Sequence, residues 1–239
     1  MRPRFSHSGG SPSASPRMSV QASRTPAQTE NATHVVGSPG SAGRPLVSVI
    51  ISNFNGRDLL CRCLNSLRQL HYPKVEVIVV DAGSTDGTPE MVLADFPEVR
   101  LVREKRVGIA EALNIGIRKS NGSIVVFELN NDDVVSPGWL DPLVDTVLRS
   151  QEVGVAGGKR YMANTDRIEE AGGRIFLGLT LGRGWMRRDS KKYNTSREVD
   201  YVSVLAVRRE IFTKIGLLDE TYFIGGDDVD FCLRVRRAG

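Results

Sequence analysis

The sequence predicts an α/β fold with a doubly wound, mostly parallel but mixed sheet that is flanked by helices. Three observations carry this prediction. Strand-like apolar runs alternate with helix-like apolar stripes from residue 45 to residue 157. The chain has 239 residues, which is enough for one domain with a substantial core. Its composition, 40% hydrophobic and 25% charged, is that of a globular protein. Strands that alternate with helices pair in parallel, because each helix returns the chain to the same end of the sheet.

Hydrophobic periodicity places the elements. Strands are expected at residues 46–52, 75–80, 99–103, 123–129 and 153–157. Helices are expected between them at residues 57–69, 85–96, 108–119 and 138–149. Either Ser84 or Thr85 is expected to cap the second of these helices, because serine and threonine are favoured at that position.

The alternation stops after Gly157. Residues 158–200 are rich in glycine, arginine and turn residues, which predicts loops and hairpins rather than another strand–helix unit. A strand at residues 199–207, a short helix at 208–215 and a last helix at 228–238 follow. The apolar side of the last helix is expected from Val229, Phe231, Leu233 and Val235.

Two segments of different composition divide the chain. Residues 1–44 hold nine serines, five prolines and five glycines without apolar periodicity, which predicts a disordered tail. This tail holds five arginines and one glutamate, and so accounts for the whole net charge of +4. Residues 45–239 are predicted to form one domain with 27 basic and 27 acidic residues. A neutral domain gives little electrostatic support for binding nucleic acid, so no nucleic-acid partner is expected.

Cysteines and histidines exclude several kinds of site. The cysteines are Cys61, Cys63 and Cys232, and the first two are too close for an ordinary disulfide, which indicates a reducing, cytoplasmic compartment. No histidine is spaced with a cysteine as zinc ligands would be. No apolar run approaches the roughly 20 residues that span a bilayer. We therefore expect no transmembrane segment, and at most peripheral contact with the inner face of a membrane.

Polar clusters follow three of the expected strands, where ligands of such sheets bind. Residues 52–56 follow the first strand, residues 81–88 the second and residues 130–133 the fourth. The glycine-rich motifs of dinucleotide sites and of P-loops are missing. Adjacent carboxylates at Asp132 and Asp133 favour a divalent ion, Mg²⁺ or Mn²⁺, that bridges phosphate oxygens. The alternative is a polar turn that caps the next helix.

A last polar cluster, Gly225–Asp230, opens the final helix. Asp227 and Asp228 are stabilised there by the helix dipole, so capping alone is one interpretation. Because the sequence offers no suitable histidine base, proton abstraction would fall to a carboxylate, a lysine or a cysteine.

These clusters belong to a series of motifs in one order. The motifs are Val47–Gly56, Val79–Thr88, Asn114–Ile117, Leu129–Val135 with Pro137–Leu140, Gly216–Asp219 and Gly226–Gly239. With them, residues 45–239 resemble the family 2 glycosyltransferases, particularly the rhamnosyltransferase-like branch. The resemblance implies the GT-A fold of nucleotide-diphospho-sugar transferases. It also implies transfer of a sugar, with inversion, from a UDP-, dTDP- or GDP-linked donor to a hydroxyl of a polysaccharide, glycolipid or lipid-linked glycan.

The resemblance also implies roles for particular residues. The donor would contact Ser52, Phe54, Asn55, Asp81, Ser84, Asn130 and Asn131. The Asn-x-Asp form of the metal motif would place the divalent ion at Asp132 and Asn130, beside Asp133. Asp228 would deprotonate the acceptor, with Asp227 next to it in the catalytic pair.

Three departures from the family pattern leave an alternative function open. Ala82 stands where many relatives have Asp or Asn, and Asp227 replaces the usual Glu. Relatives usually continue beyond the last helix, so the domain is expected to be truncated at its C-terminus. A truncated module that binds a nucleotide sugar without transferring it is the alternative. A phosphatase-like enzyme with Asp81 as nucleophile is a weaker rival, because it needs a second Asp where Gly83 stands.

Overall fold

A computed structural model describes residues 43–194 and 196–238. Within these residues the strands are β1 (Val47–Asn53), β2 (Val75–Asp81), β3 (Arg100–Arg103), β4 (Ile124–Phe127), β5 (Val155–Ala156), β6 (Arg160–Tyr161), β7 (Ile168–Glu170), β8 (Gly173–Phe176), β9 (Leu179–Gly182) and β10 (Leu205–Arg208). The α-helices are α1 (Arg57–Leu67), α2 (Thr88–Asp95), α3 (Ile109–Lys119), α4 (Leu140–Arg149), α5 (Arg209–Ile215) and α6 (Asp227–Arg237).

The central sheet has six strands in the order β3-β2-β1-β4-β10-β5. The pairs β1–β2, β2–β3 and β1–β4 are parallel, as the alternation predicts. β10 lies between β4 and β5 and is antiparallel to both. The expectation of a mostly parallel, mixed sheet is confirmed. The simple β-α-β continuation from β4 to β5 is wrong, because a strand from almost fifty residues later separates the two.

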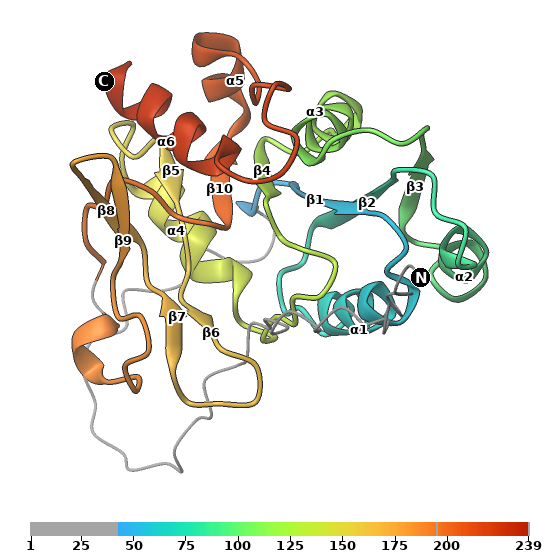
Figure 1. The fold of residues 1–239 in the computed structure, drawn as a ribbon, viewed down its shortest axis with the longest axis horizontal. Helices are drawn as coiled ribbons and strands as arrows, with labels where there is room; N and C mark the ends of the chain where they lie inside the picture. Colours follow the sequence, from blue (N-terminus) through green and yellow to red (C-terminus); the bar gives the residue numbers. More distant parts are fainter. Residues whose placement is uncertain (1–42, 195, 239) are drawn as a thin grey trace, which may run out of the picture.

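Helices cover both faces of the sheet (Figure 1). Strand alternation assigns each apolar residue to one face: Val49 and Ile51 pack with α1, α2 and α4, whereas Ile50 packs with α3, α5 and α6. Both faces are therefore apolar, and the strand ends are left as the polar edge of the sheet.

One predicted helix start is wrong. α2 begins at Thr88 and its cap residue is Gly87, with φ 81°, rather than Ser84 or Thr85. The reason is that the hydroxyl of Ser84 donates to Asp81 at 2.5 Å and is not available to a helix end. The segment after β2 is thereby kept as a loop at the sheet edge.

Residues 158–200 leave the sheet, as predicted, and form antiparallel pairs, whereas the strand expected at residues 199–207 begins only at Leu205. β6 pairs with β7, and β8 pairs with β9. The backbone of Gly173 in β8 hydrogen-bonds the carbonyl of Tyr201 at 3.0 Å, which ties the second hairpin to the strand that returns to the sheet.

α6 is held by a small aromatic cluster. The ring of Phe231 is fully buried and lies 5.4 Å from the ring of Phe127 and 5.5 Å from that of Phe212. Val229 and Val235 also pack on this core, as expected, but Leu233 does not join it. The expectation for Leu233 is wrong, because Phe231 and Val235 share a face one turn apart and Leu233 lies two positions from each of them.

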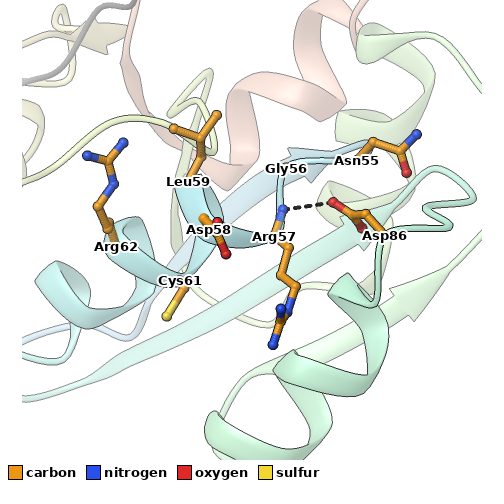
Figure 2. Close-up of a pocket in the computed structure, with 8 residues that line it drawn as sticks. All are labelled: Asn55, Gly56, Arg57, Asp58, Leu59, Cys61, Arg62 and Asp86. Carbon is orange, nitrogen blue, oxygen red and sulfur yellow. Dashed lines mark hydrogen bonds between the residues drawn. The ribbon is translucent and has the colours of Figure 1, made fainter.

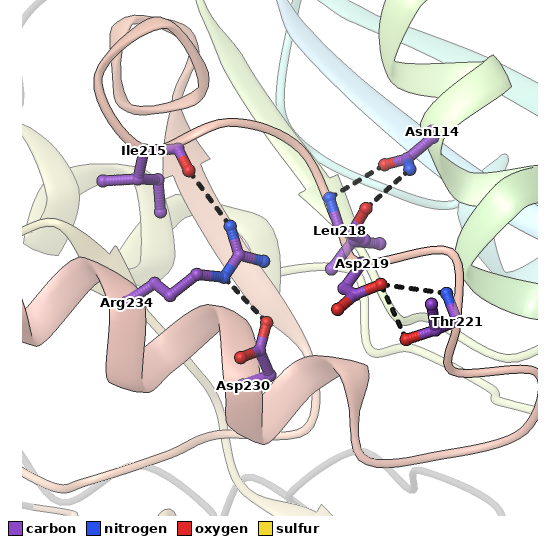
Figure 3. A network of polar contacts seen from close by, with 7 residues as sticks. All are labelled: Asn114, Ile215, Leu218, Asp219, Thr221, Asp230 and Arg234. Atoms are coloured by element: carbon purple, nitrogen blue, oxygen red, sulfur yellow. Dashed lines mark hydrogen bonds and ion pairs between the residues drawn. The ribbon is translucent and has the colours of Figure 1, made fainter.

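Polar contacts fix the loop that leads into α6 (Figure 3). The side chain of Asn114 on α3 exchanges two hydrogen bonds with the backbone of Leu218, at 2.9 and 3.0 Å. Arg234 bonds Asp230 at 2.7 Å and the carbonyl of Ile215 at 3.1 Å. The start of α6 is therefore positioned from both sides.

The predicted tail, residues 1–44, lies outside the described residues except for its last two. Arg44 belongs to the folded part, since its guanidinium pairs with Asp141 at 3.1 Å and with Asp145 at 2.6 Å on α4. In the described part of the chain no helix is both long and apolar enough to cross a membrane.

Candidate functional site

Side chains from three strand ends meet in one hydrogen-bonded network. Asn53, the last residue of β1, donates to Asp81 at the end of β2 over 3.1 Å. The side-chain amide oxygen of Asn53 accepts from the side chain of Asn131, beyond β4, at 2.6 Å. The convergence of these three segments, which the fold class implies, is present in the structure.

Asp81 is the centre of one half of this network. It is buried, and its carboxylate accepts from Asn53, from the Ser84 hydroxyl at 2.5 Å and from the Ser84 backbone N–H at 3.0 Å. A carboxylate offers about four acceptor positions, so one is left for a ligand. Asn55 closes the cluster: its N–H donates to Ser84 at 2.8 Å, and its side chain accepts from the N–H of Thr85 at 2.8 Å.

Asn53 is a central residue that the sequence analysis missed. Ser52 was expected at this place, but successive strand residues point to opposite faces, so Ser52 lies on the other face of β1 and takes no part in the network among the described residues. The available signal was that alternation, since Asn53 shares the face of Ile51. Phe54 is partly exposed, and the guanidinium of Arg106 lies 4.1 Å above its ring.

A hollow of about 700 Å³ adjoins this end of the site at the start of α1 (Figure 2). Asn55 lines it together with Asp86, which accepts from the backbone N–H of Arg57 at 3.0 Å. Two arginines, Arg57 and Arg62, and two aspartates, Asp58 and Asp86, line the hollow, so its charged side chains balance.

The side chains of the Asn130–Asp133 turn differ in whether they have a partner among the described residues. Asp133 is fully buried and accepts from the backbone N–H of Asn130 at 2.9 Å and from Arg160 on β6 at 3.0 Å. Burial raises the pKa of Asp133, and the charge of Arg160 opposes that rise. Asp132 and the side chain of Asn130 are half-buried and have no hydrogen-bond or ion-pair partner within the described residues. Asp132 and Asn130, rather than Asp133, are therefore free to bind a ligand.

A second group of acids lies at the start of α6. It consists of Glu128, Glu170, Asp227 and Asp228, which we call the acidic cluster. Asp227 is buried, and its Oδ2 has no hydrogen-bond partner in the described structure. Asp228 is half-buried; burial raises its pKa, and the charges of Asp227 and Glu170 add to the rise.

Glu128 is the second residue that the sequence analysis missed. It directly follows β4, it has an unusual left-handed backbone with φ 62°, and its Oε1 lacks a partner in the described residues. Burial raises the pKa of Glu128, and the neighbouring charge of Asp227 raises it further. The signal in the sequence was a charged residue at the end of the apolar run Ile124–Phe127.

Arg160 connects the two acidic groups. It is buried, it pairs with Asp133, and it also lies within electrostatic range of Glu128 and Glu170. The charge of Asp228 raises the pKa of Glu128, and the charge of Glu170 raises the pKa of Asp228. One continuous polar cluster thus extends from the turn after β4 to the start of α6.

Comparisons with known proteins identify the family and the fold of the chain. The model of the family described as Glycosyl transferase family 2 matches residues 48–216. An O-antigen biosynthesis protein of Myxococcus xanthus is 30% identical over 213 residues, which cover 82% of this chain and 16% of that protein. An N-acetylglucosaminyl-diphospho-decaprenol L-rhamnosyltransferase of Mycobacterium tuberculosis is 28% identical over 222 residues, which cover 81% of this chain and 71% of that one.

A solved structure shares the fold. The mannosyltransferase PcManGT of Pyrobaculum calidifontis, in complex with GDP-Man and Mn²⁺, aligns with a TM-score of 0.57 and 27% identity over 85% of this chain and 55% of its own. The chain spans between 16% and 56% of the length of three of its curated relatives. With a family model that matches most of the domain and a mixed sheet flanked by helices, the chain belongs to glycosyl transferase family 2 and has the GT-A fold.

Proposed function

We propose that residues 45–239 bind a nucleotide-diphospho-sugar across the strand ends and transfer its sugar, with inversion, to an acceptor hydroxyl. The observation that carries the proposal is the continuous polar cluster from Asp81 through Asn53 and the Asn130–Asp133 turn to Asp228. Its members are suited to bind a base and a diphosphate and to activate a hydroxyl, which supports the proposal.

The nucleotide base belongs at the Asp81 end. The remaining acceptor position of Asp81 suits an N–H of the base, and the partly exposed ring of Phe54 suits stacking. Asn55 and Ser84 hold this end in shape, whereas Asn131 ties it to the diphosphate end. The Pyrobaculum relative was solved with GDP-Man, which makes GDP a donor to test beside UDP and dTDP.

The residues of the Asn130–Asp133 turn can hold a divalent ion only if the phosphates of the donor supply further ligands. Within the described residues no group of three or more His, Cys, Asp or Glu side chains could hold a metal. Mg²⁺ is usually bound by one or two carboxylates plus substrate phosphates, and Asp132 with the amide oxygen of Asn130 meets that requirement. Such an ion, Mg²⁺ or Mn²⁺, would neutralise the diphosphate as it leaves. Asp133 is not part of this set, because Arg160 and the turn backbone occupy its oxygens.

Asp228 is the proposed general base. It takes the proton of the acceptor hydroxyl while that oxygen attacks the anomeric carbon from the side opposite the diphosphate. The bond from the anomeric carbon to the diphosphate breaks in the same displacement, which inverts the configuration. The raised pKa of Asp228 makes it a stronger base than an ordinary carboxylate. Asp227, buried beside it, adds negative charge.

The acceptor would be a polysaccharide, a glycolipid or a lipid-linked glycan. The Mycobacterium relative, by its name, acts on a lipid-linked diphospho-sugar. The three cysteines lie in the described part and are unpaired there, which supports a reducing, cytoplasmic location. The reaction would then take place at the inner face of a membrane.

A transfer assay with UDP-, dTDP- and GDP-sugars, run in Mn²⁺ and in EDTA, tests the proposal. Asp228→Asn keeps the size of the side chain but removes the base, so we expect a rate loss of roughly 10²–10⁴-fold with donor affinity unchanged. Asp227→Asn should lose less. NMR of the product should show the anomeric configuration opposite to that of the donor.

Other outcomes would contradict parts of the proposal. Donor binding without transfer to any hydroxyl or to water would favour the binding module instead. Retention of configuration would exclude the single displacement. Full turnover in Asp228→Asn with a collapse in Asp227→Asn would exchange their roles.

A further inference from the structure

The β8–β9 hairpin presents its large apolar side chains outward. Phe176 pairs with Leu179, and Arg174 pairs with Leu181. Residues directly opposite in an antiparallel pair share a face, so Phe176, Leu179 and Leu181 lie on one face with Arg174. Their exposed fractions are 63%, 66% and 54%.

The opposite face of the hairpin is turned to the protein. It carries Gly173, Ile175, Thr180 and Gly182, of which Ile175 packs on the core shared with α3 and α6. Antiparallel sheets with one face on a core normally place polar residues on the other face. This hairpin has the reverse arrangement, because its outer face is the more apolar of the two.

The turn of the hairpin adds a further apolar side chain. Leu177 and Gly178 have φ 49° and 78°, the left-handed pair of a two-residue turn for which Asn-Gly is the favoured sequence. Leu177 is instead 87% exposed in a conformation that branched and bulky residues rarely adopt. A leucine at this place favours neither the turn nor the solubility of the protein, which indicates a contact outside the chain.

Basic residues are frequent in the hairpin and in the segment that follows it, and Arg174 lies on the apolar face itself. Residues 173–193 contain six basic side chains, Arg174, Arg183, Arg187, Arg188, Lys191 and Lys192, and one acidic side chain, Asp189. The rest of the domain is correspondingly acidic, because residues 45–239 balance to zero. Trp185, directly after β9, is 65% exposed. Tryptophan and basic side chains around an apolar surface are typical of the interface of a bilayer that contains anionic lipids.

We propose that the outer face and turn of the β8–β9 hairpin, with Trp185, dock on an anionic phospholipid bilayer. A second copy of the chain is disfavoured as the occupant, because it would bring two strongly basic segments together. The hairpin is tied to the helix of the proposed base: Asp200 accepts from the backbone N–H of Ile175 at 2.8 Å and pairs with Arg236 on α6. Docking therefore orients α6 relative to the bilayer. The hairpin stands on the far side of the molecule from β3 and α2 (Figure 1).

Sedimentation of the full chain with vesicles tests this proposal without any need for activity. The protein should bind vesicles of equimolar phosphatidylcholine and phosphatidylglycerol, bind phosphatidylcholine alone much more weakly, and be released by high salt. Replacing Phe176→Ser, Leu177→Asn and Leu179→Ser together should weaken binding at least about tenfold. If that variant does not fold, Leu177→Asn, which suits the left-handed turn, should fold and weaken binding severalfold.

Matched controls separate the hairpin from other contributions. Leu93→Ser with Leu148→Ser removes two exposed leucines from α2 and α4 and should leave binding unchanged. The arginines of residues 1–44 are the same in all variants, so they cannot produce a difference between them. Bound vesicles should shift the emission of Trp185 to the blue, and Trp185→Phe should remove that shift.

Three results would overturn the proposal. They are equal binding to both kinds of vesicle, undiminished binding by the hairpin variant, and no blue shift on binding. A different result would assign the face to a second copy of the chain: the parent associates with itself and does not bind vesicles, and the hairpin variant no longer self-associates.

Discussion

At the scale of single residues, the structure separates side chains that look equivalent in the sequence. Asp132 and Asp133 are adjacent, yet one is available to a ligand and the other is fully buried against Arg160. Asn53, not Ser52, joins the strand ends. Each distinction leads to a variant with a definite outcome.

The two carboxylates of the turn should fail in different ways. Asp132→Asn should abolish the enhancement of donor binding by Mn²⁺, measured by calorimetry, and leave the melting temperature unchanged. Asp133→Asn leaves Arg160 without its closest partner and should lower the free energy of unfolding by about 3 kcal/mol. Equal Mn²⁺ enhancement in the parent and Asp132→Asn would remove this residue from the metal site.

Asn53→Ala should weaken nucleotide binding and stability together. It leaves Asp81 and Asn131 each without one buried partner, at a cost of about 1–3 kcal/mol. UDP, dTDP or GDP, whichever the parent binds, should bind roughly tenfold more weakly, which corresponds to about 1.4 kcal/mol. Asn65→Ala is the control, since the exposed Asn65 side chain, within the part of the chain that the structure describes, bonds only Cys61 one turn away on α1. Unchanged nucleotide affinity in Asn53→Ala would show that the network is only structural.

The pH dependence of transfer should follow the ionisation of Asp228. A general base works only when deprotonated, so kcat should fall as the pH falls through its pKa. Because burial raises the pKa of Asp228, this acid limb should lie above the ordinary range for an aspartate. The limb should disappear from the residual rate of Asp228→Asn. A pH-independent parent rate down to the ordinary aspartate range would contradict the assignment.

At the scale of elements, the start of α6 depends on an unusual turn. Gly225 and Gly226 precede the helix with φ 72° and 94°, conformations that other residues rarely adopt. A Cβ at Gly226 would also lie 3.2 Å from the ring of Tyr222. The turn thus sets where Asp227 and Asp228 point.

Gly226→Ala should therefore reduce transfer more than it reduces stability. The left-handed conformation costs an alanine about 1–2 kcal/mol, and relief of that strain would move the start of α6. Gly138→Ala is a suitable control, because a Cβ at Gly138 meets open space. Steady-state rates and thermal melts of both variants decide the matter; a fully active Gly226→Ala would show that the turn does not position the base.

At the scale of the whole molecule, Arg44 is attached to the folded part of the chain. Arg44 contacts Asp141, Asp145 and the ring of Tyr72, so it fastens the start of β1 to α4. We propose that residues 1–43 do not contribute to folding. A chain that starts at Arg44 should melt within a few degrees of the full chain. A chain that starts at Pro45 should melt at a slightly lower temperature. It loses a partly exposed ion pair, which contributes about 1 kcal/mol or less to the free energy of unfolding. A large loss in the first of these chains would show that the N-terminal segment packs on the domain.

The sequence by itself determined the elements and the edge of the sheet that carries the site. Apolar runs and stripes are local patterns, so β1, β2 and α1 could be placed from residues a few positions apart. The parallel order of β1, β2 and β4 predicted that the polar residues after these strands lie at one edge of the sheet. Only the tertiary structure decided which strand lies between β4 and β5, which face of β1 supplies the network, and that Glu128 and Arg160 join the cluster. Those features depend on contacts between residues 27 or more positions apart, such as Asp133 with Arg160 and Asn53 with Asp81. A local period carries no information about such pairs, because burial and pairing across the sheet are set when the whole chain packs.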